Sequence, residues 1–266
     1  MRLIDSHCHL QAERLADDVD VVLAAARDAG VERILVPGWN SWSSTAALEL
    51  VERVTWLDAA VGVHPHDADK VSDDEWAGIM RQAQDERVVA IGETGLDYDR
   101  VFSPVLAQRA NLRQNLALAA ETGKPVILHC RSRAGEREAQ DALLAEVRAF
   151  GGALRPIIHS FSGPVDYAEA MLELGAFISI SGLAFREGEE ATADVVRLVP
   201  SDRLLVETDS PFLSPRGAPR ARNTPEWVRI TAAWVAELRG EEPDVLGAQL
   251  VRAYDRMLAR SDAPVS

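Results

Sequence analysis

The sequence predicts an α/β protein, a (β/α)8 TIM barrel with an additional C-terminal helix. Eight short apolar segments alternate in regular order with longer helical patterns, as they do in a closed parallel barrel. The 266 residues suit one such barrel, and no linker rich in Ser, Gly or Pro divides them. We therefore expect one domain over residues 1–260, followed by a frayed tail over 261–266.

The strands are predicted from the short apolar segments. In chain order they are Leu3–Ser6, Arg33–Pro37, Leu57–Gly62, Val88–Gly92, Pro125–Leu128, Pro156–Ile158, Ala176–Ile180 and Leu204–Glu207. An open doubly wound sheet is the alternative arrangement, but it usually carries a Gly-rich phosphate-binding loop after its first strand. No such loop follows Leu3–Ser6, which favours the closed barrel.

The helices are predicted between and after these strands. In order they are Asp17–Ala29, Ser43–Val54, a helix opened by Ser72, Pro104–Thr122, Glu136–Phe150, Val165–Leu174, Glu189–Val199, Pro225–Leu238 and a closing helix Pro243–Leu258. Gly30 can end the first of them, because glycine readily adopts the left-handed conformation that follows many helices. Ser43 or Ser44 can cap the second. Ser72 and Glu75 have the spacing of a capping box at the start of the third.

The composition is that of a globular protein, with 47% hydrophobic and 26% charged residues. No apolar segment approaches the roughly 20 residues that span a bilayer, and charge interrupts the N-terminus, so we expect no secretory signal and a cytoplasmic protein. Two cysteines, Cys8 and Cys130, are too few for a disulfide framework and are expected to be small buried side chains. The net charge of −14 argues against binding DNA through a broad basic surface, although metal ions and arginines can bind it locally.

The histidines indicate where the functional site lies. All six lie at the end of a predicted strand or in the turn just after it, and none falls in a predicted helix: His7, His9, His64, His66, His129 and His159. In a (β/α)8 barrel the carboxyl ends of all strands face one rim, where active sites are built. Histidines used only for packing or surface polarity would also occur in the helices. Glu93 and Asp209 follow the fourth and eighth strands and add carboxylates to this rim.

These side chains have the chemistry of metal ligands. His7 and His9 are two residues apart in an extended segment, so their side chains point to the same side. The other candidate ligands at strand ends are Glu93, His129, His159 and Asp209. Such a set suits one or two divalent ions, with Zn, Mn, Ni or Co favoured over Ca because nitrogen ligands dominate.

Two ions in one site need a bridging ligand. Some barrel hydrolases use a carboxylated lysine, but Lys124 precedes the fifth strand, at the wrong end of the barrel, and Lys70 lies in a loop. The Glu93 carboxylate can bridge instead, with one oxygen for each ion. Its alternative role, a buried carboxylate paired with an arginine, is less favoured because burying it without a cation is costly.

The strand-end segments resemble the motifs of the TatD family of metal-dependent hydrolases. The matching segments are Asp5-Ser6-His7-Cys8-His9-Leu10, Gly62-Val63-His64-Pro65-His66, Ile91-Gly92-Glu93-Thr94-Gly95-Leu96-Asp97-Tyr98, His129-Cys130-Arg131, His159-Ser160-Phe161-Ser162-Gly163, Ile178-Ser179-Ile180-Ser181-Gly182, Leu204-Leu205-Val206-Glu207-Thr208-Asp209-Ser210-Pro211 and Arg222-Asn223-Thr224-Pro225. They follow the family's order along the chain. Departures from the family's pattern, such as Gln11, Ala184 and Phe212, bear on substrate choice and remove no candidate ligand.

The resemblance implies a barrel that uses two divalent metal ions (Zn, Mn, Mg, Ni or Co) to hydrolyse phosphodiester bonds, typically in DNA. It implies that one ion is held by His7, His9, Glu93 and Asp209. The second would be held by Glu93, His129 and His159. His64 and His66 would face the substrate phosphate or an extra metal.

The expected catalytic residues are Asp209, Glu93 and His64. The ions lower the pKa of a water toward neutrality, Asp209 orients that water and accepts its proton, and Glu93 bridges the ions. His64 and His66 donate hydrogen bonds to the phosphate oxygens. The expected substrate-binding residues are His66, Arg131 and Arg222.

Other rim residues have supporting roles in this hypothesis. Asp97, Tyr98 and Glu207 would orient the ligands. Arg186 and Arg220 are further candidates for phosphate contacts, each with a solvated surface role as the alternative. Trp39 and Trp42 either stack on a base or cover the mouth of the barrel.

Two other readings of the same barrel stay open. One is a related hydrolase that acts on a small amide, lactone or phosphoester substrate, because similar metal barrels catalyse those reactions. The other is a barrel retained as a non-enzymatic binding module, which would be expected to have lost a ligand. We expect DNA as the partner, no membrane association, no obligate protein partner, and a monomer or weak oligomer.

Overall fold

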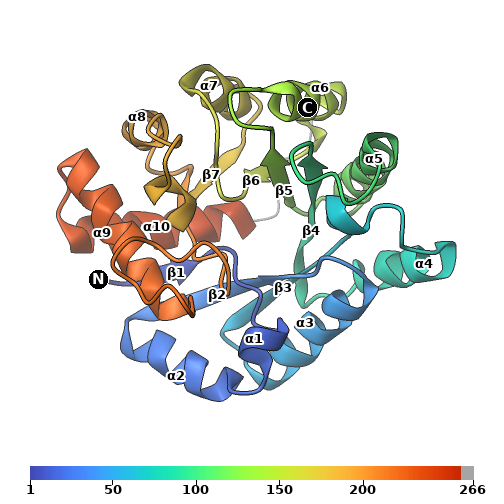
Figure 1. The fold of residues 1–266 in the computed structure, drawn as a ribbon. Coiled ribbons are helices and arrows are strands. Elements are labelled where there is room, and N and C mark those ends of the chain that lie inside the picture. The colour runs from blue at the N-terminus through green and yellow to red at the C-terminus, as the bar shows by residue number, and fades with distance from the viewer. Residues whose placement is uncertain (259–266) are drawn as a thin grey trace, which may run out of the picture.

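The chain forms an eight-stranded parallel barrel, which confirms the predicted fold (Figure 1). The structure is a computed structural model that describes residues 1–258. The strands are Leu3–Asp5 (β1), Val31–Pro37 (β2), Leu57–Val61 (β3), Val88–Asp97 (β4), Val126–Arg131 (β5), Pro156–Ile158 (β6), Phe177–Ile180 (β7) and Leu204–Val206 (β8). Each pairs in parallel with the next along the chain. The ring closes between β8 and β1, where the Ser6 amide donates to the Val206 carbonyl at 3.0 Å.

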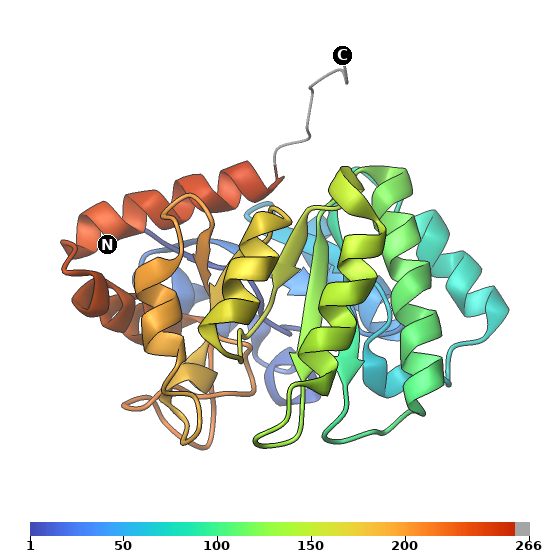
Figure 2. The same ribbon diagram turned by 90° about the horizontal axis from the view of Figure 1, so that it is seen from above.

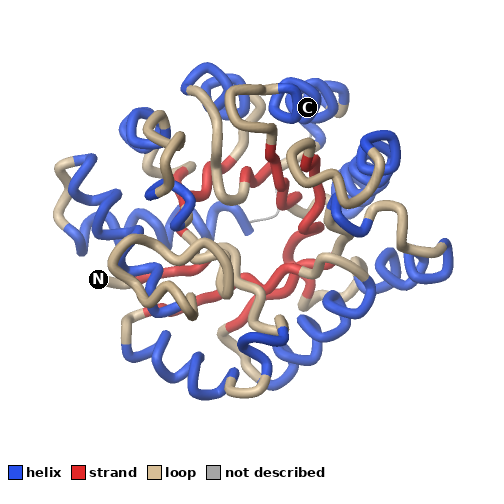
Figure 3. The backbone as a smooth tube through the Cα atoms, in the orientation of Figure 1, coloured by secondary structure: helices blue, strands red, loops and turns tan. Residues whose placement is uncertain are grey.

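Helices surround the ring of strands on the outside (Figure 3). They are Glu13–Ala16 (α1), Val19–Asp28 (α2), Ser41–Arg53 (α3), Asp73–Gln82 (α4), Val105–Thr122 (α5), Glu138–Ala149 (α6), Val165–Glu173 (α7), Thr192–Leu198 (α8), Val228–Arg239 (α9) and Pro243–Leu258 (α10). Short 3-10 turns occur at Pro65–Asp67 (η1), Gly151–Ala153 (η2), Gly182–Phe185 (η3) and Pro225–Trp227 (η4). Among residues 1–258, no helix combines the length and apolar character needed to cross a bilayer.

The two ends of the barrel differ. The long loops that follow the strands lie together at one end, and α10 lies at the other, beside the N-terminus (Figure 2). The N-terminal ammonium group forms an ion pair with Asp244 at 2.9 Å, which joins the start of the chain to α10. The end that carries the loops is therefore the rim on which the polar strand-end residues meet.

The strands are buried on both faces, as parallel strands covered by helices must be. Every residue of β3 and of β8 is buried. The one acidic residue in β3, Asp58, is paired with Arg33 and accepts a hydrogen bond from the Tyr254 hydroxyl at 2.8 Å. Burial of these apolar segments fixes the barrel and leaves the residues that follow each strand to form the rim.

Some helix boundaries differ from those predicted. The predicted helix Asp17–Ala29 is present as α2, and the short helix α1 that precedes it was not predicted. Helix α3 begins at Ser41, directly after its N-cap residue. That residue is Asn40, whose side chain accepts a hydrogen bond from the Ser43 amide, and not the predicted Ser43 or Ser44. The predicted capping box of Ser72 and Glu75 is present at the start of α4. The predicted frayed tail over 261–266 lies outside the described residues.

Two strands extend further at their carboxyl ends than predicted. Strand β4 continues past Gly92 to Asp97, and β5 continues past Leu128 to Arg131. Gly95 pairs with His129 across the two strands, so Glu93 and His129 lie within strands rather than after them. Pairing between neighbouring strands here overrides the polar and glycine residues that would otherwise end an apolar segment.

The close approach of β4 and β5 requires glycine at position 95. Gly95 has a φ of +141°, and a Cβ atom there would lie 1.9 Å from the His129 carbonyl oxygen. We expect Gly95→Ala to lower the free energy of unfolding by more than about 3 kcal/mol, because backbone strain and a rigid clash add together. Chemical denaturation measures this. Gly152→Ala is the control, since a Cβ there meets nothing within 4 Å, and equal effects of the two substitutions would contradict the prediction.

Candidate metal centre

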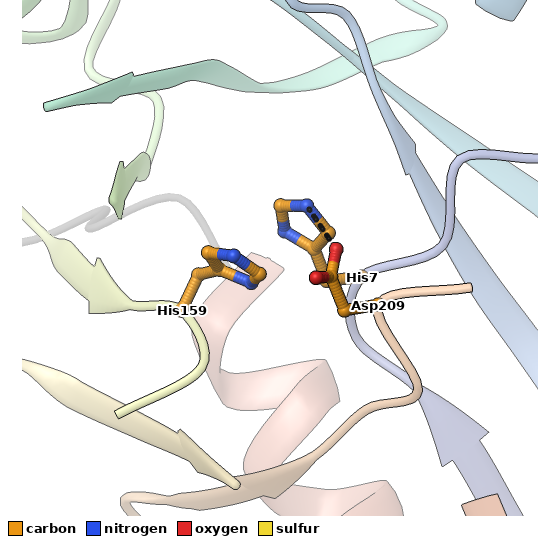
Figure 4. A group of neighbouring side chains, drawn as sticks. All are labelled: His7, His159 and Asp209. Carbon is orange, nitrogen blue, oxygen red and sulfur yellow. Dashed lines mark ion pairs between the residues drawn. The ribbon is translucent and has the colours of Figure 1, made fainter. Parts of the chain in front are cut away.

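The predicted ligands and His64 converge at the rim from six strands. His7 and His9 follow β1, His64 lies just before η1, Glu93 lies in β4 and His129 in β5, while His159 follows β6 and Asp209 follows β8. Figure 4 shows three of them, His7, His159 and Asp209, gathered from the beginning, middle and end of the chain. The His7 and His159 rings are stacked, with centroids 3.7 Å apart. Side chains distant in sequence thus share one small buried volume.

The first donor group consists of His7, His9, Glu93 and Asp209. The His7 and His9 Nε2 atoms lie 3.1 Å apart and are 3.2 and 3.5 Å from Glu93 Oε2. Asp209 Oδ1 is 3.7 Å from His7 Nε2 and 3.4 Å from His9 Nε2. All four residues are buried. Four electronegative atoms therefore face one point that water scarcely reaches.

These distances fit a divalent cation. Donors around a tetrahedral ion with bonds of about 2.1 Å lie roughly 3.4 Å from one another. The distances between donor atoms in the first group run from 3.1 to 3.7 Å. Imidazole and carboxylate donors brought this close and removed from water repel one another unless a cation or proton lies between them.

The second donor group is centred on the other oxygen of Glu93. Glu93 Oε1 lies 3.3 Å from His64 Nε2, 3.2 Å from His129 Nδ1 and 3.5 Å from His159 Nε2. Sequence reasoning expected His64 to face the substrate phosphate or an extra metal, and the structure brings it as close to Glu93 as the two other imidazoles. Glu93 thus directs one oxygen into each group.

The electrostatics of the centre favour an ionised Glu93. Burial opposes ionisation, but His64, His159 and His7 hold the pKa of Glu93 well below its usual range. Burial lowers the pKa of His64 to about 4 and also lowers the pKa of His7, so both imidazoles are neutral near pH 7. A neutral imidazole keeps the lone pair that a metal or a hydrogen-bond donor needs.

Glu207 holds His159 in place. The His159 Nδ1 atom lies 2.7 Å from Glu207 Oε1, and the same oxygen accepts from the Ser160 amide at 2.7 Å and the Ser160 hydroxyl at 2.8 Å. Burial disfavours the imidazolium, yet Glu207 and then Glu93 raise the pKa of His159 to about 10. A cation that binds at Nε2 would displace that proton. The contact fits the ligand-orienting role that the sequence suggested for Glu207.

Asp97 contacts two of the rim histidines. Its Oδ2 atom lies 2.7 Å from His66 Nε2 and 3.5 Å from His129 Nε2. Burial works against its ionisation, but hydrogen bonds from His129 and His66 hold the pKa of Asp97 below its usual value. The buried carboxylate therefore fixes the orientation of His66 and of the neighbouring His129.

Sequence reasoning gave no role to Asp5. Its buried carboxylate accepts from the Thr208 amide at 2.9 Å and from the Thr208 hydroxyl at 2.5 Å. This contact joins the end of β1 to the loop that carries Asp209. The signal that could have found it is the period of two in Asp5, His7 and His9, which puts the three side chains on one side of an extended segment.

The predicted phosphate-binding arginines lie at the edge of the rim. Arg131 is exposed, and its Nε is paired with Asp99 at 2.8 Å. Arg222 is exposed and paired with Asp18, which precedes α2. Arg186 and Arg220 are also exposed. Neither Arg131 nor Arg222 contacts the donor groups in the described part of the chain, since each is held by an acidic residue.

The lysines lie away from the metal centre. The Lys124 ammonium group donates to the carbonyls of Ala83 and Asp85 at 2.6 and 3.0 Å, in the segment before β4. Lys70 is paired with Asp67 at 3.0 Å. No lysine among residues 1–258 is thus placed between the two donor groups. Cys8 and Cys130 are both buried and free, as small apolar side chains would be.

Comparison with known proteins agrees with this geometry. The family model described as "TatD related DNase" matches residues 4–259. A protein of Erwinia billingiae named 3'-5' ssDNA/RNA exonuclease TatD is 38% identical over 257 residues, covering 93% of this chain and 95% of its own. The uncharacterised metal-dependent hydrolase YabD of Bacillus subtilis is 35% identical over 238 residues, covering 89% and 91%. The crystal structure of YJJV, a TatD homologue of Escherichia coli, matches with a TM-score of 0.88 and 30% identity, covering 96% and 97%.

The fold and the donor groups define a metal-dependent hydrolase built on a (β/α)8 barrel. The order of the motifs, the length of chain matched and the similarity in structure all indicate the same family within this class. The chain belongs to the TatD family of metal-dependent hydrolases and deoxyribonucleases.

Proposed function

We propose that this protein hydrolyses phosphodiester bonds in single-stranded nucleic acid, with two divalent ions held by the two donor groups. The observation that carries the proposal is the division of the Glu93 carboxylate, with Oε2 3.2 Å from His7 and Oε1 3.2 Å from His129. Relatives named for exonuclease action on single-stranded DNA and RNA support the substrate class. The cytoplasm remains our expectation for where the protein acts, and a monomer or weak oligomer remains our prediction.

The candidate ligands divide into two sets. The first ion would be held by His7, His9, Glu93 and Asp209. The second would be held by Glu93, His129 and His159. Bound to these donors, divalent ions would lower the pKa of water and take up negative charge on the phosphate. Among Zn, Mn, Mg, Ni and Co, the imidazole-rich donor set favours the transition metals over Mg.

Side chains of the protein would accept the proton and position the water and the substrate. The Asp209 carboxylate accepts the proton of the attacking water and keeps that water in line with the phosphorus. Its backbone is held in place, since the Asp209 amide donates to the His7 carbonyl at 2.9 Å. Asp209 adopts a left-handed conformation with φ 52°, a strained arrangement that is frequent in active sites. Asp97 contacts His66 at Nε2, and in this proposal the other edge of the ring faces the substrate.

His64 acts as a hydrogen-bond donor in this proposal. Its Nδ1 accepts from the His66 amide at 3.1 Å. Because the pKa of His64 is about 4, the ring is neutral near pH 7 and carries its single proton on Nε2. Nε2 lies 3.3 Å from Glu93 Oε1, and in this proposal its N–H donates to the substrate phosphate. A metal at Nε2 would require the proton to move to Nδ1, where it would face the His66 N–H.

We expect His64→Ala to leave the metal content unchanged. Loss of a donor to the phosphate should lower kcat/KM by about 100-fold, as removal of one oxyanion donor does in other hydrolases. Elemental analysis and cleavage of a single-stranded oligonucleotide measure the two effects. His129→Ala is the comparison, and it should lower the metal content. Loss of an ion from the His64 variant would make His64 a ligand instead.

The proposal is tested by joining elemental analysis to a cleavage assay. The purified protein should contain two transition-metal ions per chain and cut end-labelled single-stranded DNA or RNA in preference to duplex. Chelation should stop the reaction, and Mn should restore it. A panel of D-aminoacyl and lactone substrates separates the alternative hydrolases. Turnover of one of those with no nucleic-acid cleavage would overturn the proposal.

A further inference from the structure

The exposed aromatic side chains of the described residues all lie on one rim of the barrel. Trp42 is 61% exposed, Phe102 59% and Phe212 50%, and the other exposed large hydrophobic residues are aliphatic. Trp42 lies in the first turn of α3, after β2; Phe102 lies between β4 and α5; and Phe212 follows β8. Figure 2 shows the loop after β8 and the loop between β4 and α5 at the end of the barrel opposite α10. We call these three side chains the rim aromatics.

The rim aromatics flank the metal centre. The Phe212 ring centroid lies 5.9 Å from that of His9, in the first donor group. Trp42 lies 5.8 Å from Trp39, which in turn lies 5.1 Å from His9. On the other side, the Phe102 ring lies 4.7 Å from His66. Aromatic surface therefore borders the centre both on the His9 side and on the His66 side.

The backbone beside two of these rings adopts a left-handed conformation. Val101, beside Phe102, and Leu213, beside Phe212, both have a φ of 47°. The left-handed region is unfavourable for Val and Leu, so the fold sets these loop shapes against local preference. A surface pocket of about 200 Å³ runs along α3 from Trp42 to Glu49 and Arg53, and Leu10 and Val19 line its other side.

We propose that the rim aromatics stack on unpaired bases that flank the scissile phosphate, and so confer the preference for single strands. The inference rests on the proposed nuclease function and names residues that would determine its specificity. Many nucleic-acid-binding proteins attract phosphates through a positively charged surface. A protein with a net charge of −14 lacks this overall attraction. Stacking on aromatic side chains adds affinity that does not depend on charge. In a duplex the base faces are covered by neighbouring bases and cannot contact the rings.

The test compares strands that differ only in their bases. Steady-state kinetics are measured for a single-stranded oligonucleotide and for the same strand with abasic residues, using Trp42→Ala, Phe102→Ala and Phe212→Ala. Each substitution should raise KM for the base-bearing strand by roughly 5-fold or more, the effect of losing one base stack. The value of kcat should change little, and KM for the abasic strand should stay at the wild-type value.

Matched variants separate stacking from structural damage. Phe212→Tyr and Phe102→Trp keep an aromatic ring and should keep the wild-type KM. Val245→Ala removes an exposed side chain from α10, at the opposite end of the barrel, and should have no effect. Elemental analysis of each variant should give the wild-type metal content, which shows that the donor groups are intact.

Two results overturn the stacking proposal alone. One is a KM for the base-bearing strand within about 2-fold of wild type in all three alanine variants, which is less than one stack contributes. The other is an equal rise on the base-bearing and the abasic strand. If wild-type protein with its metal cleaves neither strand, the proposed nuclease function fails as well. The two failures are thus distinguished by the wild-type rate.

Discussion

Glu93→Gln is expected to lower kcat/KM for single-stranded DNA by more than about 100-fold, since loss of a residue that only orients a metal ligand already costs about 10- to 100-fold. The amide has one oxygen and one NH₂ group. One of the two donor groups would then face N–H bonds, which cannot bind a cation. The protein should lose at least one of its two ions as well as its activity.

Elemental analysis and steady-state kinetics on the same preparation measure both effects of this substitution. Glu121→Gln makes the same chemical change on an exposed residue of α5 and should behave as wild type. Circular dichroism checks that the barrel remains folded. Two ions per chain together with near-normal turnover in the Glu93 variant would remove Glu93 from its bridging role.

Asp209→Asn should reduce kcat by about 10²- to 10⁴-fold, the range expected for removal of a group that accepts a proton in the reaction. The asparagine keeps an oxygen near His9, where Asp209 Oδ1 lies at 3.4 Å, so metal binding should be weakened less than turnover. Kinetics at saturating Mn distinguish the two, because excess metal restores occupancy but cannot replace the missing base.

The control for this substitution is Asp194→Asn, which changes an acidic residue on the outer surface of α8, where it pairs with Arg197. It should leave kcat unaltered. Recovery of wild-type turnover by the Asp209 variant at high Mn would mean that Asp209 only binds the ion, and the proton would then have to pass to another acceptor.

The capping box of α4 was predicted correctly from local sequence, whereas the lengths of β4 and β5, which depend on pairing between the two strands, were not. The capping box of Ser72 and Glu75 needs only four consecutive residues, so the sequence contains all of the information that forms it. Strand β4, in contrast, runs on through Gly92 and Gly95 because β5 pairs with it. Residues at positions 126–131 therefore determine the length of β4, and no local pattern in β4 contains that information.

The proximity of the site residues was predicted better than their individual contacts. The carboxyl ends of barrel strands must meet, so the proximity of His7, Glu93 and Asp209 follows from topology alone. The place of His64 depends on the path of the chain between β3 and η1, which strand ends do not specify. The pairing of Arg222 with Asp18 joins residues far apart in sequence. The metal and substrate roles of these residues stay predictions.

The join between β8 and β1 makes the first donor group depend on both halves of the polypeptide. His7 and His9 follow β1, whereas Asp209 and Thr208, whose hydroxyl donates to Asp5, follow β8 about 200 residues later in the sequence. A chain without β8 would lack Asp209 and hold an incomplete first donor group. The complete group therefore forms only once β8 has paired with β1, so we expect metal uptake to report that the barrel has closed.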